Sequence, residues 1–250
     1  MATIRIAAAA DVHGAEVHRE RIERAFGDLE GRAELVLLAG DLTTHGQPEE
    51  AAVVADACRL LDVPVVAVLG NHDVHAGRDR EVVRVLREAN VTVLERGWTI
   101  IAIDDAEIGI VGTKGFVGGF PGSTLPDFGE PLLRRVYAET TAEQEAIAEG
   151  LRCVAHADLR IVLLHYAPIE ETVQDEPLGI RVFLGASRLA IPIAEYPPEL
   201  VLHGHAHRGR FEGRIGEVPV YNVAVHVTGR DFWIFDLEVA ARGRAEVEVE

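Results

Sequence analysis

The chain has 250 residues and 48% of them are hydrophobic, so it can bury a substantial core without disulfides. Its formal net charge of −17 repels polyanions at long range and argues against nucleic acid as the main ligand. No run of about 18 apolar residues is present, and residues 1–10 lack the charged-then-apolar layout of a signal peptide. We therefore expect a cytoplasmic protein without a membrane span.

The first half of the chain alternates between patterns typical of strands and of helices. Short apolar runs closed by Gly, Asp or Asn predict buried strands, and apolar residues at helical spacing predict the helices between them. The expected strands are Ile4–Ala10, Glu34–Ala39 and Val63–Leu69, and the expected helices cover 17–29, 48–61 and 81–89. This alternation indicates βαβ units, and the continuous hydrophobicity of the strands indicates a largely parallel sheet covered on both faces.

After residue 97 the pattern changes. Trp98–Ile103 and Glu107–Val111 read as an antiparallel pair that starts or extends a second sheet. Ile161–Leu164 and Leu200–Leu202 read as further buried strands, and the tail from Phe211 to Val249 reads as a β-meander. With no internal repeat and no disordered linker, we expect one domain over residues 1–250.

The segment 112–131 is rich in Gly and Pro and precedes a long predicted helix near 132–156. We treat it as an irregular insertion. A functional loop beside a site and an ordinary surface excursion fit it equally well. Its glycines do not form a phosphate-binding loop of the G-x-x-x-x-G-K-[ST] type.

The two cysteines, Cys58 and Cys153, lie far apart in the sequence, and neither belongs to a metal-type spacing. Each lies in a helical pattern, so we expect two buried free thiols. Free thiols favour a reducing compartment.

Five polar motifs mark the chemistry of the chain, and four of them follow a short apolar run. They are Asp11-Val12-His13, Gly40-Asp41, Gly70-Asn71-His72-Asp73, His165 and Gly204-His205-Ala206-His207. Ligands of open α/β sheets bind outside the carboxyl ends of the strands, so these residues are expected at one edge. Carboxylates, an amide oxygen and imidazoles suit two divalent ions about 3.5–4 Å apart, an arrangement that attacks phosphate esters.

Each motif alone has an ordinary structural explanation. Asp11 or Asp41 could cap a helix, and Asn71 could form a turn. His165 on its apolar run could be a hydrogen-bonded core histidine. All of these explanations together require five independent coincidences in order, so we interpret the motifs as one site.

The order and wording of the motifs resemble the calcineurin-like metallophosphoesterase superfamily over residues 4 to about 225. The resemblance implies a four-layer α/β/β/α sandwich of two mixed β-sheets flanked by helices. It also implies two divalent metal ions. One would be held by Asp11, His13, Asp41 and His207, and the other by Asp41, Asn71, His165 and His205, with Asp41 bridging.

The resemblance further implies that water acidified between the two ions attacks phosphorus in line. His72 would stabilise the transition state or protonate the leaving oxygen, and Asp73 would orient the ring of His72. The oxygen and imidazole ligands suit Mn²⁺ or Fe²⁺ first, with Zn²⁺ or Ni²⁺ as alternatives.

Two positions differ from those of well-known branches of the superfamily, and these differences narrow the expected class of enzyme. His45 stands where the protein Ser/Thr phosphatases carry a phosphate-binding Arg, and Thr44 stands where the purple acid phosphatases carry a Tyr ligand. The residues of the motifs resemble instead those of the small bacterial-type phosphodiesterases. These enzymes act on cyclic nucleotides or on nucleotide- or lipid-linked phosphoesters. We therefore expect a phosphodiesterase for a small organic phosphoester.

Four alternative functions compete with a phosphodiesterase. A phosphomonoesterase of the same superfamily differs only in the surroundings of the metals. A DNA exonuclease needs a basic track, which the charge of −17 opposes. A non-catalytic metal-binding scaffold would be expected to lack ligands, whereas all seven and His72 are present. A purely structural metal site would favour a closed Cys/His tetrahedron. No pattern indicates an oligomeric state.

Several further residues lie near the motifs. His203 is expected to pack at a strand end. His45 and His75 could line the pocket, but we expect solvated loop residues. Arg208 and Lys114 could contact substrate phosphate, but we expect exposed charges. For Phe116, Phe120 and Tyr166, a place in a substrate wall competes with ordinary packing.

Overall fold

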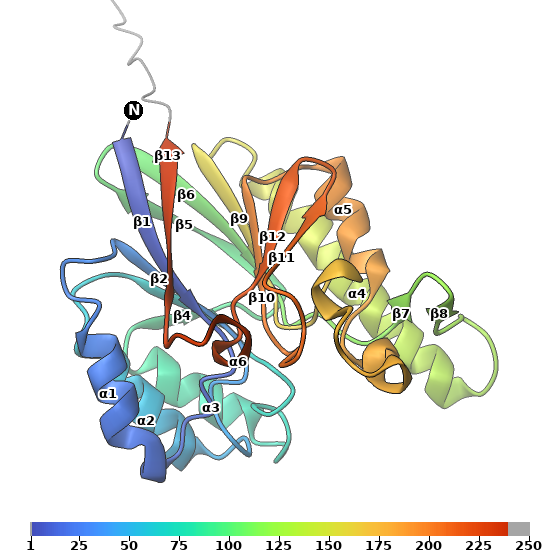
Figure 1. Ribbon diagram of the computed structural model, residues 1–250, viewed down its shortest axis with the longest axis horizontal. Coiled ribbons are helices and arrows are strands. Elements are labelled where there is room, and N and C mark those ends of the chain that lie inside the picture. The colour runs from blue at the N-terminus through green and yellow to red at the C-terminus, as the bar shows by residue number, and fades with distance from the viewer. Residues whose placement is uncertain (1, 240–250) are drawn as a thin grey trace, which may run out of the picture.

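The computed structural model describes residues 2–239. Its first sheet has the strand order β13–β1–β2–β3–β4 (Figure 1). Strands β1 to β4 run parallel, and β13 pairs antiparallel with β1 at the sheet edge. The strands are β1 (Ala2–Ala9), β2 (Leu35–Ala39), β3 (Val65–Val68), β4 (Val91–Val93) and β13 (Trp233–Val239).

The helices between these strands cover the outer face of the first sheet. They are α1 (Arg19–Gly27), α2 (Pro48–Cys58) and α3 (Asp79–Arg87), preceded by a short 3₁₀ turn at Glu16–His18. The strands and helices predicted for the first half of the chain are confirmed within a few residues at their ends.

The second sheet has the strand order β11–β12–β10–β9–β6–β5. Strands β6, β9, β10 and β12 run parallel, while β5 and β11 are antiparallel at the two edges. The strands are β5 (Gly97–Ile103), β6 (Ala106–Gly112), β9 (Leu159–Leu163), β10 (Leu200–His203), β11 (Glu212–Ile215) and β12 (Val218–Asn222). Helices α4 (Pro131–Cys153) and α5 (Ala190–Glu195) lie on its outer face (Figure 1).

Alternate side chains of β2 show how the layers pack. Val36 and Leu38 join the cluster shared with α1 to α3, whereas Leu35 and Leu37 join the cluster between the two sheets. A third cluster, which includes Ile147 of α4, fills the space behind the second sheet. Burial of both faces accounts for the unbroken apolar runs. The predicted four-layer α/β/β/α sandwich of two mixed sheets is confirmed.

The C-terminal region differs from the predicted meander. The short helix α6 (Val225–Thr228) follows β12, and β13 then leaves the second sheet and pairs with β1 of the first. Alternation along a strand predicts a covered face but not the sheet to which the strand belongs, so this crossing has no local signal. The part of the predicted meander at 240–249 lies outside the described residues.

The segment 112–131 contains a small hairpin, β7 (Gly119–Phe120) and β8 (Ser123–Thr124). Opposite it, 3₁₀ turns occur at Glu171–Val173, Leu178–Phe183 and Ser187–Leu189. Both thiols are free; Cys58 is buried as predicted, but Cys153 is only half-buried. Within residues 2–239, no helix is long and apolar enough to cross a membrane.

Candidate metal centre

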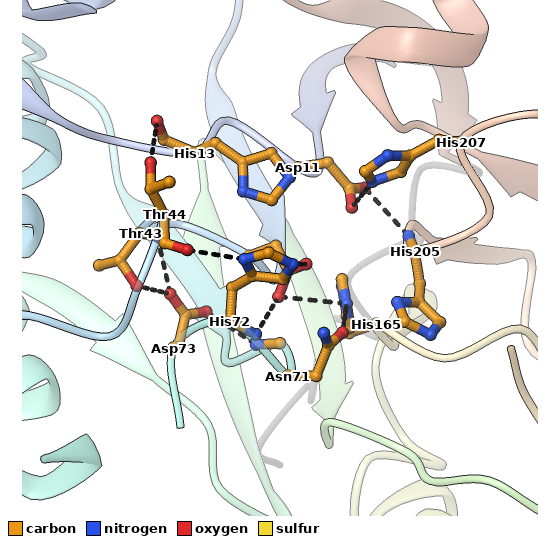
Figure 2. Close-up of polar contacts among 12 residues, drawn as sticks. Asp11, His13, Thr43, Thr44, Asn71, His72, Asp73, His165, His205 and His207 are labelled. Carbon is orange, nitrogen blue, oxygen red and sulfur yellow. Dashed lines mark hydrogen bonds and ion pairs between the residues drawn. The ribbon is translucent and has the colours of Figure 1, made fainter. Parts of the chain in front are cut away.

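The predicted ligands meet where the parallel strands of both sheets end (Figure 2). The first sheet supplies Asp11 after β1, Asp41 after β2 and Asn71 after β3. The second sheet supplies His165 after β9 and the His205–His207 segment after β10. The site thus lies between the carboxyl edges of two packed sheets. The first sheet contributes all three oxygen ligands together with His13 and His72, and the second contributes imidazoles alone.

The backbone turns sharply at several of these positions. Asp11, His13, Asp41 and His205 all have positive φ, between 48° and 70°. Side chains other than glycine visit this left-handed region rarely, at a cost of about 1–2 kcal/mol per residue. Four such residues in one site indicate that the surrounding contacts impose these turns.

Glycines in the motifs allow close approach of the carboxylates. A Cβ atom at Gly70 would lie 2.1 Å from Oδ1 of Asp41, and a Cβ atom at Gly204 would lie 2.4 Å from Oδ2 of Asp11. Any side chain at either position would therefore displace a carboxylate. Glycine is required at these two positions because the Gly70 loop contacts Asp41 and the Gly204 loop contacts Asp11.

The first cluster of possible ligands consists of Asp11, His13 and His207, whose donor atoms lie within 4.8 Å of one another. Nε2 of His207 lies 2.8 Å from Oδ1 of Asp11. Burial opposes ionisation of Asp11, but the hydrogen bond from His207 and the charge of His165 outweigh it and lower the Asp11 pKa. Nδ1 of His13 is buried and has no hydrogen-bond partner among the described residues.

The second cluster consists of Asp41, His165 and His205. Nδ1 of His165 donates to the carbonyl of Ala39 at 2.9 Å, so its Nε2 faces two oxygens, Oδ1 of Asn71 at 3.0 Å and Oδ1 of Asp41 at 3.3 Å. A neutral ring would direct a lone pair at both oxygens. Either a proton on Nε2 or a cation between these atoms is therefore required.

The charge balance of the second cluster agrees with this geometry. Burial lowers the pKa of His165, but the charge of Asp41 reverses the shift and raises it to about 9. Burial lowers the pKa of His205 to about 3, so this ring is neutral at physiological pH. Burial also works against ionisation of Asp41, yet its histidine neighbours hold its pKa well below the usual range.

Asp41 lies between the clusters. It belongs to the group with His165 and His205 and also to a group with His13 and His72. Its Oδ1 accepts a hydrogen bond of 2.8 Å from the amide of His72. The donors of this site are oxygen and imidazole nitrogen without a thiolate, a set that suits divalent Mn, Fe, Zn or Ni. The unpartnered Nδ1 of His13 and the buried Nε2 of His165, which faces two oxygens, also fit cations at these two places.

His72 and Asp73 do not form the pair that the sequence suggested. Nδ1 of His72 lies 2.7 Å from the carbonyl of Thr44 and donates to it. The buried carboxylate of Asp73 instead accepts hydrogen bonds from the amides of Leu42, Thr43 and Gly70 and from the hydroxyl of Thr43. Asp73 therefore joins the Asp41 loop to the Asn71 loop.

The neighbouring residues divide into surface and interior. His203 is buried and bonded to the hydroxyl of Thr172, as expected for strand-end packing, and His45, His75 and Arg208 are exposed as predicted. Lys114 departs from prediction. Its side chain is half-buried rather than exposed, and burial lowers its pKa.

One residue at the site, His226, was not predicted from the sequence. This exposed residue of α6 stacks on the ring of His207 with 4.2 Å between centroids and 11° between planes. The signal available was its position, shortly after a strand of the second sheet, which the other motifs share. The predicted β-meander did not include the short helix α6 that carries His226 to the site.

The chain matches the family model described as calcineurin-like phosphoesterase over residues 4–209. A probable glycerophosphodiester phosphodiesterase GpdQ of Arcobacter nitrofigilis is 26% identical over 185 residues, which cover 73% of this chain and 60% of that protein. A probable cyclic nucleotide phosphodiesterase of Synechococcus sp. is 26% identical over 196 residues, which cover 78% of this chain and 66% of that protein. The chain thus spans less than two thirds of either relative.

A solved structure of phosphopantetheinyl hydrolase from Mycobacterium tuberculosis superimposes with a TM-score of 0.64 at 15% identity. The match covers 93% of this chain and 95% of that one. At this identity the likeness concerns the fold alone.

Proposed function

Because the chain belongs to the calcineurin-like phosphoesterase family, we propose that it uses two divalent metal ions to hydrolyse a small organic phosphodiester. The observation that carries this proposal is the position of Asp41, shared by the His165–His205 group and the His13–His72 group. The names of the two relatives, both phosphodiesterases, support a diester over a monoester. The relatives' substrates, a glycerophosphodiester and a cyclic nucleotide, are candidates for the substrate class.

We assign one ion to Asp11, His13, Asp41 and His207, and the other to Asp41, Asn71, His165 and His205. When bound, such ions acidify a water nucleophile and offset the charge of the phosphoryl group. The unpartnered Nδ1 of His13 and the two oxygens facing Nε2 of His165 support the assignment. Mn²⁺ or Fe²⁺ is the proposed native metal, with Zn²⁺ and Ni²⁺ as alternatives.

His72 is the proposed proton donor to the leaving oxygen. The carbonyl of Thr44 holds a proton on Nδ1 of His72, which leaves Nε2 as the atom that would carry the proton to the leaving oxygen. That Nε2 lies 3.9 Å from Oδ2 of Asp41, beside the proposed bridging ligand. The ring is partly exposed and accessible to a substrate.

Asp73 is a positioning residue in this proposal. Its carboxylate binds the backbone after Asp41 and the backbone before Asn71, so it fixes the distance between two proposed ligands. It does so without contacting the substrate. For the location we propose a reducing cytoplasm, which the free thiols of Cys58 and Cys153 favour.

The test is hydrolysis of bis-p-nitrophenyl phosphate and of p-nitrophenyl phosphate, after chelation and then re-addition of Mn²⁺. We expect metal-dependent cleavage of the diester that is lost in Asp41→Ala and kept in the exposed control Asp62→Ala. Faster cleavage of the monoester would replace the proposal with a phosphomonoesterase. Two bound metals with no cleavage of either compound would favour the metal-binding scaffold. Full metal-dependent turnover in Asp41→Ala would overturn the site assignment.

A further inference from the structure

Lys114 is the only lysine in the chain, and every other residue of the Lys and Arg class is an arginine. It follows β6 and lines a cavity of about 380 Å³ together with Arg96, Glu139 and Glu143. Other walls of the cavity come from Leu69 and Val74, on either side of the Asn71–Asp73 loop, and from the end of β4. The cavity thus borders the residues on either side of the loop that carries Asn71, while none of the proposed metal ligands lines it.

The ammonium group of Lys114 rests on aromatic rings. Its Nζ lies 4.4 Å from the centroid of the Phe116 ring and 5.0 Å from that of Tyr166. Its ammonium donates a hydrogen bond to the carbonyl of Gly115, and no carboxylate among residues 2–239 comes within the ion-pair distance of 4.0 Å. An ammonium has three protons to donate, so this group is left with capacity for a ligand.

Four acidic residues line the cavity, Asp79, Glu95, Glu139 and Glu143, and within residues 2–239 all of them except Asp79 form an ion pair with an arginine. Glu143 accepts hydrogen bonds from Arg96, from the amide of Gly115 and from the hydroxyl of Thr113. Glu139 pairs with the same Arg96. Glu139 and Glu143 therefore share Arg96 as their ion-pair partner. Neither forms an ion pair with Lys114, whose charge is left without a direct counter-ion in the described part of the chain.

Lys114 is also fixed relative to the metal centre. Its carbonyl accepts hydrogen bonds from the amides of His165 at 3.1 Å and Tyr166 at 3.0 Å. The Tyr166 ring under its Nζ lies 4.5 Å from the His205 ring, between centroids. One aromatic ring therefore separates the ammonium from a proposed metal ligand, a span that a substrate arm of a few atoms can cross.

We propose that Lys114 binds a second anionic group, a carboxylate or a phosphate, carried on one ester arm of the phosphodiester substrate. The cavity beside Asn71 takes that arm, and the rings of Phe116 and Tyr166 hold the ammonium toward it. The inference rests on the proposed function and adds to it the class of substrate. It makes Lys114 a specificity-determining residue that acts away from the scissile phosphorus.

The first experiment compares two diesters that differ in one charge, p-nitrophenyl 2-carboxyethyl phosphate and its carboxylate methyl ester. The wild type should prefer the free carboxylate by roughly ten- to a hundredfold in kcat/KM, the range for hydrogen bonds to charged groups. Lys114→Met should lose that preference, Lys114→Arg should keep part of it, and the surface control Arg24→Met should keep all of it. The 2-phosphoethyl analogue shows whether phosphate or carboxylate is favoured.

The second experiment needs no turnover. Reductive ¹³C-methylation labels one lysine and the N-terminus, and the Lys114→Arg spectrum identifies the lysine signal. In the metal-loaded protein, 3-phosphonopropionate should shift this signal, whereas propylphosphonate, which lacks the carboxylate, should not.

Equal shifts with both phosphonates, or none, would overturn the proposal, as would an unchanged carboxylate preference in Lys114→Met. Failure of the proposed function is distinguishable, because the wild type would then cleave neither diester while the lysine signal still reports on anion binding.

Discussion

The carboxylate of Asp73 accepts two hydrogen bonds from Thr43, one from the backbone amide and one from the hydroxyl, each at 2.7 Å. Its other oxygen accepts from the amides of Gly70 and Leu42. A buried carboxylate thus joins the loops that carry Asp41 and Asn71, and the integrity of the site depends on a residue that need not touch a metal or a substrate.

Asp73→Asn should weaken both folding and metal binding. An amide keeps only one accepting oxygen, so at least one pair of donors is left unsatisfied in a buried place, at about 1–3 kcal/mol per donor. Urea unfolding of the metal-free protein at pH 8 and a Mn²⁺ titration measure the two losses, with the exposed Asp62→Asn as control.

The cost of Asp73→Asn should depend on pH. Burial and the charge of Asp41 raise the pKa of Asp73 to about 6, above its value in the unfolded chain, so below about pH 6 the folded wild type binds a proton more readily than the unfolded chain does. Protonation of Asp73 therefore stabilises the folded wild type as the pH falls from 8 to 5, whereas the amide of Asp73→Asn does not titrate. The stability difference between the two proteins should grow as the pH falls from 8 to 5, and a difference that shrinks toward low pH would contradict the assignment.

Gly70→Ala should displace Asp41. The added Cβ would lie 2.1 Å from Oδ1 and 2.4 Å from the backbone nitrogen of Asp41, so the loop must move. We expect a loss of about 1–3 kcal/mol in stability, typical of overpacking, and weaker metal binding. Gly27→Ala, where no atom lies within 4 Å of the added Cβ, is the matched control and should have no such effect. Wild-type metal affinity in Gly70→Ala would show that the loops do not pack this closely.

His72→Ala should retain both metals and lower kcat for the diester by about 10²- to 10⁴-fold, the usual contribution of a positioned proton donor. Metal content measured by elemental analysis separates a chemical defect from loss of the ions. His75→Ala, three residues along and exposed, should keep both properties. Loss of a metal in His72→Ala would make this histidine a ligand instead.

Metal uptake should release a proton from His165. In the metal-free protein Asp41 raises the pKa of His165 to about 9, so the ring carries a proton at pH 7.5 that coordination through Nε2 must displace. Metal affinity should consequently rise with pH until about 9. Calorimetry of Mn²⁺ binding in two buffers of different ionisation enthalpy counts the protons, and His165→Asn should release fewer. Equal proton release by the wild type and His165→Asn would refute the protonated state of His165.

Much of the fold was predictable because its central strands are buried on both faces. All five residues of β2 are buried, and such a run carries its own signal. The convergence of Asp11, Asp41 and His165 followed from the rule that parallel strands present their carboxyl ends at one edge.

Contacts between segments that are distant in the sequence could not be predicted in the same way. The pairing of β13 with β1 depends on which sheet has a free edge, which no local pattern encodes. The enclosure of Lys114 depends on residues from β4 and α4, and the attachment of Asp73 to Thr43 depends on how two loops meet. Single-residue patterns identify donors but not the partners that distant segments bring to them.

The proposed ligands are divided between the two sheets, and this division orders the assembly of the site in time. All oxygen donors, Asp11, Asp41 and Asn71, precede the imidazoles of the second sheet along the chain, of which His207 is the last. A chain emerging from the ribosome therefore presents carboxylates long before it presents a complete coordination sphere. In the proposed assignment each ion would take ligands from both sheets, so a bound ion would cross-link the two sheets of the sandwich.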